Sequence, residues 1–385
     1  MHPIRNLAGT VAVVLAAVGG VAGPAAAHTQ AHVDPGGHAG FTGPVGEVFA
    51  QSDNLTGNTV TVYDRDRGGA LSPAGTYSTG GDGGQLDGSV VDHLASMNSL
   101  VYDAGAKLLF AVNAGSNTVT EFAARGDRLA LEQVIPSGGS FPVSIAVHGD
   151  LVYVLNALAG GSVQGYRLEF GRLVPIPGSQ RPLGLDPAET PQFTSTPGDV
   201  AFSPDGSQLL VTTKGNGNDI DVFGVGRFGQ LSPTPTVNVE AGLVPFSLAF
   251  EPGDQVAVAD AGDNAVQTFR LDHRGVLTQV ASVLTGQMAT CWIVADGSLL
   301  FAGNAGSGTE SALVDHFGSL SVLGTTPTDA GTVDAALSPD GGYLYVQTGA
   351  AGIVDGFRVG FGGSLTEVGS VTVPGAIGGE GIATS

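Results

Sequence analysis

The feature that most constrains this chain is an internal repeat that occurs seven times. Each copy has an aliphatic residue, two further positions, an aromatic residue and, several residues later, a leucine. Six copies place the aromatic residue at Tyr63, Phe122, Tyr166, Phe223, Phe269 and Phe357. In a degenerate seventh copy, between Leu313 and Leu320, we assign His316 to the aromatic position. The copies recur about every 49 residues, a spacing typical of β-propeller blades.

Each copy follows a short apolar run, such as Leu108 to Val112 or Tyr343 to Val346. Runs of this length that are rich in β-branched and aromatic residues indicate strands buried on both faces. Tight turns precede several of the runs, most clearly Pro204-Asp205-Gly206, where each residue type favours a turn for its own reason. The pattern predicts four antiparallel strands per repeat, and therefore an all-β, seven-bladed β-propeller.

The first repeat has no strand of its own before residues 45–50, whereas residues 373–385 are left over after the last repeat. Within that tail, Gly381-Ile382-Ala383 resembles Ser144-Ile145-Ala146, which precedes a buried strand. We therefore predict that the C-terminal strand completes blade one and covers two sheet edges. We expect this closure to bury Ile377 and Ile382.

The N-terminal residues are typical of a secretory signal. Arg5 precedes an apolar stretch at residues 7–21, and small residues at 25–27 suit cleavage before His28. We predict a signal peptide at 1–27, a flexible lead at 28–44, a propeller at 45–385, and a secreted, extracellular protein. No segment is long and apolar enough to span a membrane. Cys291 is the only cysteine, so we expect a buried free thiol that behaves as a small apolar side chain.

The net charge of −21 and the absence of a basic run argue against nucleic-acid binding. We predict no cofactor and a monomer. An N-terminal His28 with His32 and His38 could chelate copper or zinc, but a flexible tail with incidental histidines is the simpler interpretation. Residues 216–221 lack the glutamate of a calcium loop, and turn chemistry explains them better. We therefore predict no metal site.

The Ser-Pro-Asp-Gly turns at 203–206 and 338–341, each followed by an apolar strand, resemble those of lactonase-like seven-bladed propellers with YVTN-like repeats. That group includes bacterial 6-phosphogluconolactonases and carboxymuconate-cyclase-type enzymes, and the resemblance covers residues 45 to 385. It implies the propeller fold. Catalytic members carry histidine and arginine before the innermost strands and glutamate after the second strand. This sequence departs from that pattern, so no catalytic residue is carried over.

Propeller loops at one end of the ring surround the mouth of the central channel, which is a suitable ligand site. Our candidates for this rim are His93, Asp199, Lys214, Asp260 and Glu380. His93 could act as a base oriented by Glu380, and Lys214 could neutralise a carboxylate. The alternative is that these side chains are solvated or cap buried backbone groups. The connector at 174–199 is long and proline-rich, so it is either a lid or a stiff spacer.

Two functions from different classes fit these observations. In the first, the chain is a secreted binding or scaffold protein whose channel mouth engages a small molecule, a glycan or a protein. In the second, it is a lactonase or cycloisomerase that acts on an anionic lactone or muconate-type substrate. We favour the first, because an acidic chain with two lysines holds a carboxylate poorly.

Overall fold

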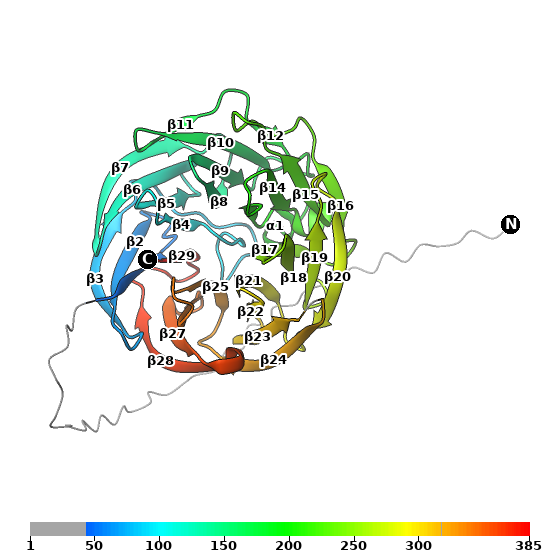
Figure 1. Cartoon of the computed structure of the whole chain (residues 1–385). Helices are drawn as coiled ribbons and strands as arrows, with labels where there is room; N and C mark the ends of the chain where they lie inside the picture. The colour runs from blue at the N-terminus through cyan, green and yellow to red at the C-terminus, as the bar shows by residue number, and fades with distance from the viewer. Residues whose placement is uncertain (1–43, 317) are drawn as a thin grey trace, which may run out of the picture. The chain divides into compact units, whose positions relative to one another are not determined.

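The computed structural model describes residues 44–316 and 318–385, and seven antiparallel sheets form its ring (Figure 1). We call the sheets blades I to VII in chain order. The fold prediction is thereby confirmed. The predicted signal peptide, the lead up to residue 43 and the three N-terminal histidines lie outside the described residues.

Each blade has four strands ordered from the channel outward, and blade III has one additional short strand on β10. The strands of blades I to III are β29 (Ile382–Thr384), β1 (Gly46–Gln51), β2 (Thr59–Arg65), β3 (Leu71–Ser78); β4 (Leu100–Asp103), β5 (Leu108–Asn113), β6 (Thr118–Arg125), β7 (Arg128–Pro136); β8 (Pro142–His148), β9 (Leu151–Asn156), β10 (Ser162–Glu169), β11 (Arg172–Pro175), β12 (Arg181–Pro182).

The remaining blades follow the same order. Their strands are β13 (Val200–Phe202), β14 (Gln208–Thr212), β15 (Asp219–Gly224), β16 (Thr236–Val239); β17 (Pro245–Glu251), β18 (Gln255–Asp260), β19 (Ala265–Leu271), β20 (Leu277–Leu284); β21 (Thr290–Asp296), β22 (Leu299–Asn304), β23 (Thr309–Asp315), β24 (Leu320–Pro327); β25 (Thr332–Leu337), β26 (Tyr343–Thr348), β27 (Ile353–Val359), β28 (Leu365–Thr372). The helices are single turns: α1 (Gln192–Ser195), α2 (Lys214–Gly217) and η1 (Phe361–Gly363).

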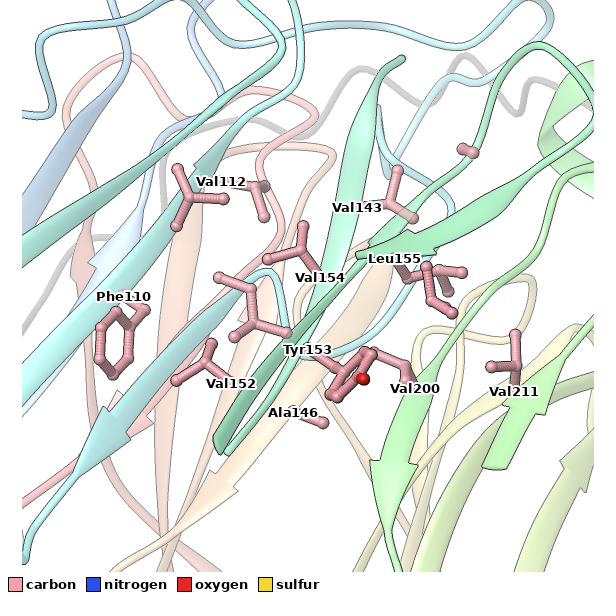
Figure 2. Packing of buried hydrophobic residues seen from close by; sticks show 14 of the residues in the cluster. Phe110, Val112, Val143, Ala146, Val152, Tyr153, Val154, Leu155, Val200 and Val211 are labelled. Atoms are coloured by element: carbon pink, nitrogen blue, oxygen red, sulfur yellow. The ribbon is translucent and has the colours of Figure 1, made fainter. Parts of the chain in front are cut away.

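The second strands are buried on both faces because a neighbouring blade covers each side. In β9 the side chains of Val152, Tyr153, Val154 and Leu155 are all fully buried. Figure 2 shows them packed between strands of blades II and IV, with Phe110 on one side and Val211 on the other. Each blade therefore hides its apolar faces against its neighbours, as the apolar runs predicted.

The repeated aromatic residue lies on the third strand, next to a shift in its pairing with the fourth. Such shifts precede Phe122, Phe269 and Phe357. In blade VI the shift precedes Leu313, whose side chain is fully buried, whereas His316 is exposed in the following turn. The assignment of His316 to the aromatic position was therefore wrong by three residues. Glu310 consequently occupies the position of the repeat's aliphatic residue.

The C-terminal strand closes the ring as predicted. β29 pairs antiparallel with β1, so Phe49 lies opposite Ala383 and Ala50 opposite Ile382. Ile382 is buried at 4% exposure. Ile377, by contrast, is 67% exposed, so the prediction that it is buried was wrong. It lies in a turn before the strand, where no neighbouring blade covers it.

The antiparallel order gives the ring two chemically different ends. Loops between second and third strands share one end with the connectors between blades, and we call this the mouth end. Turns between first and second strands and between third and fourth strands lie at the other end, which we call the hairpin end. The longest connectors, residues 79–99 and 176–199, both belong to the mouth end.

Candidate functional site

Part of the connector between blades I and II lies across the ring at its mouth end, in contact with blades on both sides. We call residues 86–99 of this connector the plug. Leu86, Leu94 and Met97 are buried within it. The plug directly precedes β4, the innermost strand of blade II, which begins at Leu100. It makes contacts across the ring.

Hydrogen bonds join the plug to blades III and IV. The Ser96 hydroxyl donates to the carbonyl of Val143 at 2.9 Å, and the Ile145 amide donates to the carbonyl of Asn98. The Met97 amide donates to the carbonyl of Gly198, which precedes β13. These bonds are buried, so they fix the plug backbone against strands that are distant in sequence.

The opposite blades hold the plug through apolar contacts and one indole bond. Met97 packs in a cluster with Phe246 of blade V, Trp292 of blade VI and Val333 of blade VII. Trp292 Nε1 donates to the carbonyl of Ser96 at 2.7 Å. Cys291 is a buried free thiol in the same cluster, as predicted. The plug is therefore packed against strands on both sides of the channel.

The plug turn is organised by the buried carboxylate of Asp92. Its oxygens accept hydrogen bonds from the amides of Leu94, Ala95 and Ser96 at 2.8, 2.7 and 3.1 Å. Burial raises the pKa of Asp92, although these bonds and the charge of Lys214 oppose the shift. A carboxylate that caps three successive amides fixes the plug conformation.

Lys214 lies beneath the plug and is fully buried. Its Nζ donates to the carbonyls of Ala95 at 2.6 Å and Phe193 at 2.8 Å. The ammonium also lies 5.0 Å from the centre of the Phe246 ring. Burial lowers the pKa of Lys214, whereas the charge of Asp92 raises it. This lysine therefore joins the plug to the 176–199 connector.

A second group of carboxyls surrounds Glu380, immediately before the closing strand. Glu380 Oε2 accepts from the Ser96 hydroxyl at 3.2 Å, and the Glu380 amide donates to Asp53 Oδ2 at 2.7 Å. Burial raises the pKa of Glu380, and the nearby carboxyls of Asp334 and Asp53 raise it further. Burial also raises the pKa of Asp53 to about 8. At neutral pH this group therefore retains protons that exposed carboxyls would lose.

Asp199 acts as a bridge between neighbouring blades. Its oxygens accept from Ser144 Oγ of blade III at 3.1 Å and from the Leu248 amide of blade V at 2.9 Å. Asn98 Nδ2 of the plug also donates to Asp199 at 3.0 Å. Burial raises the pKa of Asp199 to about 6.

The structure thus brings four of the five candidates together around the plug. His93 is part of it, and Asp199, Lys214 and Glu380 bond to it. Asp260 does not join them: it accepts from Gln267 Nε2 at 2.7 Å at the end of β18. Within the described residues, the His93 side chain makes no hydrogen bond to Glu380, and its Nδ1 has no partner. Burial lowers the pKa of His93.

The plug itself was missed from sequence. The available signal was the length of the 79–99 connector, which exceeds ordinary propeller loops and contains five large apolar residues. The connector predicted at 174–199 as either a lid or a spacer spans 176–199 in the structure, and it contributes Phe193 and Gly198 to the plug contacts.

A small hollow lies beside the plug at the mouth end, between blades III and IV. Its cavity volume is about 20 Å³, enough for about one water molecule, so it is a shallow feature of the surface. Its walls come from residues 157–160, from residues 185–196 of the long connector and from Asn216. Asp186 and Glu189 are exposed on its rim, so the hollow has an acidic border.

The mouth end as a whole is acidic. Its exposed ionisable side chains include Asp82, Asp87, Asp186, Glu189, Asp263 and Asp329. Among the described residues, the basic side chains on its loops and connectors are His93, Arg181 and Lys214. Lys214 is buried, and the Arg181 guanidinium donates to the carbonyls of Leu231 and Ser232 on the outer wall. The electrostatic potential at this end therefore disfavours the binding of anions.

No group of three histidine, cysteine, aspartate or glutamate side chains in residues 44–316 and 318–385 is placed to hold a metal ion. Within the same residues, no helix has the length and apolarity to cross a membrane.

Solved structures of proteins described as lactonases share this architecture. A candidate 6-phosphogluconolactonase from Bacteroides fragilis superposes with a TM-score of 0.71 at 19% identity, covering 91% of this chain and 99% of that one. One from Bacteroides uniformis gives 0.70 at 19% identity, over 88% and 99%.

The periplasmic gluconolactonase of Pseudomonas aeruginosa gives a TM-score of 0.69 at 17% identity, over 88% of this chain and 98% of that one. At these identities the likeness is one of fold. No protein-family model and no curated protein sequence matches the chain.

Proposed function

We propose that this chain is a secreted binding or scaffold propeller whose mouth end engages a neutral or cationic small molecule, glycan or protein. The observation that carries the proposal is the acidic mouth, where Asp186 and Glu189 border the hollow and Lys214 is buried. Like charges across an interface cost binding energy, so anionic ligands are disfavoured there.

The roles of the central residues support the same proposal. Lys214, which could have neutralised a substrate carboxylate, donates instead to two backbone carbonyls. Asp199 bridges blades III and V, and Glu380 accepts from the plug. These side chains therefore hold the plug closed, and the exposed loops around it are left for ligand binding.

The test is a ligand screen by thermal shift and calorimetry with neutral oligosaccharides, cationic peptides and anionic aldonolactones as separate groups. We expect shifts from the first or second group, which weaken in the double variant Asp186→Asn, Glu189→Gln. The matched control is Asp254→Asn, which removes one exposed carboxylate at the hairpin end. Selective binding of anionic ligands would overturn the proposal.

A lactonase or cycloisomerase is the second candidate, favoured by the fold shared with the Pseudomonas aeruginosa periplasmic gluconolactonase. In this chain a reaction at the channel would require the plug to open, with His93 as the available base. Hydrolysis of gluconolactone or 6-phosphogluconolactone that is lost in His93→Ala would favour this candidate over binding. Hydrolysis unchanged in that variant would remove His93 from the site.

A further inference from the structure

Two carboxyl groups are in contact where the closing strand, the plug and blade VII meet. The side chains of Asp334, on β25, and Glu380, just before β29, are hydrogen-bonded to each other. Both side chains are buried. A carboxylate oxygen only accepts hydrogen bonds, so a bond between two carboxyl groups requires a proton on one of them. We call Asp334 and Glu380 the acid pair.

The acid pair joins three parts of the ring. Asp334 Oδ2 accepts from the amide of Ile382 in the closing strand at 3.3 Å. Glu380 bonds to the plug, where its Oε1 accepts from the Ser99 amide at 3.4 Å and its Oε2 from the Ser96 hydroxyl. The Ser99 hydroxyl donates in turn to the Glu380 carbonyl at 2.9 Å. The bond within the pair therefore connects blade VII both to the last strand and to the plug.

Further ionisable groups face the acid pair from the elements packed around it. They are Asp53 after β1, Asp92 in the plug and Asp199 before β13, with His93, Lys214 and Cys291 close to Asp92. The three further carboxyls are buried and disfavour a second negative charge on the pair. Burial lowers the pKa of His93 and raises that of Cys291, so both side chains are neutral at pH 7. The charge of Lys214 acts on Asp92.

The proton within the pair is therefore held more tightly than in water. Burial raises the pKa of both carboxyls, and the carboxyl of Asp334 raises the pKa of Glu380 further. Exposed aspartate and glutamate side chains are both ionised above about pH 5. The closed arrangement retains a proton that a released plug and strand would lose to solvent. A rise in pH therefore favours release.

We propose that the acid pair is a pH-sensitive latch, which fastens the plug and the closing strand to blade VII while it shares a proton and frees the plug at mildly alkaline pH. When the proton passes to solvent, the bond within the pair is lost and two carboxylates face each other in a buried contact. The second strands are held between blades by apolar packing, which does not titrate, so the blades persist while the plug is free. The latch is independent of which ligand the mouth end engages.

The test is amide hydrogen exchange of the full chain from pH 6 to 9, corrected at each pH for the intrinsic exchange rate. We expect protection of residues 86–99 to fall by at least about 10-fold per pH unit, which is the dependence that one released proton produces. The plug amides should exchange faster than those of β9 at every pH, which distinguishes release of the plug from unfolding. Acrylamide quenching of Trp292, whose indole donates to the Ser96 carbonyl, should rise over the same range and reverse at pH 6.

Glu380→Gln replaces the shared proton with an amide hydrogen, which can donate to Asp334 at any pH. In this variant the fall in plug protection should be shallower by about one proton, that is by about 10-fold per pH unit. Asp334→Asn should have the same effect from the other side of the bond, and it serves if the glutamine variant does not fold. The matched control is Glu121→Gln, which changes a buried carboxyl that accepts from the Leu173 amide and should follow the parent.

Plug protection that does not change between pH 6 and 9 would overturn the proposal. An equal pH dependence in the parent and both acid-pair variants would also overturn it, because the released proton would then belong to Asp53, Asp92 or Asp199. Plug amides that exchange no faster than those of β9 would do the same, since the plug would then be released only when the whole ring unfolds.

Discussion

Ring closure by β29 predicts that two isoleucines five residues apart differ greatly in their effect on stability. Ile382 is buried among Val48, Tyr63 and Tyr345, which come from blades I and VII, whereas Ile377 is exposed. Replacing a buried isoleucine with alanine costs about 2–5 kcal/mol, because apolar contacts are lost and a cavity remains. The same change at an exposed position is usually within about 0.5 kcal/mol.

The loss at Ile382 is large relative to a domain stability of about 5–15 kcal/mol. We expect Ile382→Ala to lower the midpoint of urea unfolding strongly without changing the slope, and Ile377→Ala to leave both unchanged. Trp292, the single tryptophan, is buried at the plug and reports unfolding by fluorescence. Deleting residues 379–385 also removes the backbone bonds to β1, each worth about 1 kcal/mol, and should abolish cooperative unfolding.

Equal midpoints for the two alanine variants would refute this reasoning, since they would show that the seam between blades I and VII contributes no stability. A truncated chain that melts within a few degrees of the parent would do the same.

Three further predictions concern the buried polar groups. Lys214→Met should accelerate proteolytic cleavage within residues 86–99, because two carbonyls lose their donor; Lys107→Met, at an exposed turn, should not. Because burial raises the pKa of Asp53 to about 8, the folded state binds more protons than the unfolded state above pH 4, and stability should fall as pH rises to about 8. Thermal melts from pH 5 to 8.5 should show a weaker fall in Asp53→Asn, and parallel profiles would contradict the assignment. Glu310→Val should raise the free energy of unfolding by about 1–3 kcal/mol, since neither carboxyl oxygen has a partner among the described residues. A free energy of unfolding below that of the parent would indicate a role for the carboxyl group.

The fold was predictable because the evidence for it is local and repeated. Each apolar run and turn belongs to one blade, and the resemblance of Gly381-Ile382-Ala383 to other innermost strands identified the closing strand. The degenerate repeat of blade VI was misaligned because His316 was assigned to the aromatic position for its aromatic side chain. Leu313 fills the same buried position without an aromatic ring, and only the shift in strand pairing identifies it.

The candidate site was less predictable because its contacts join distant residues. Asp199, Lys214 and Glu380 lie near one another because the ring topology places their loops at one end. Their burial depends on the plug, and the partners of Lys214 are backbone carbonyls at Ala95 and Phe193. A backbone carbonyl has no side-chain identity, so no sequence pattern reveals such a bond.

Closure by the last residues also sets the order in which the molecule can be completed. β1 emerges early in synthesis, but its inner partner, β29, is the last strand of the chain. At about 5–20 residues per second, the ribosome needs roughly 20–80 s to reach it. During that interval the edge of blade I is unpaired, so the nascent chain cannot lock into its final form until residues 382–384 have been synthesised.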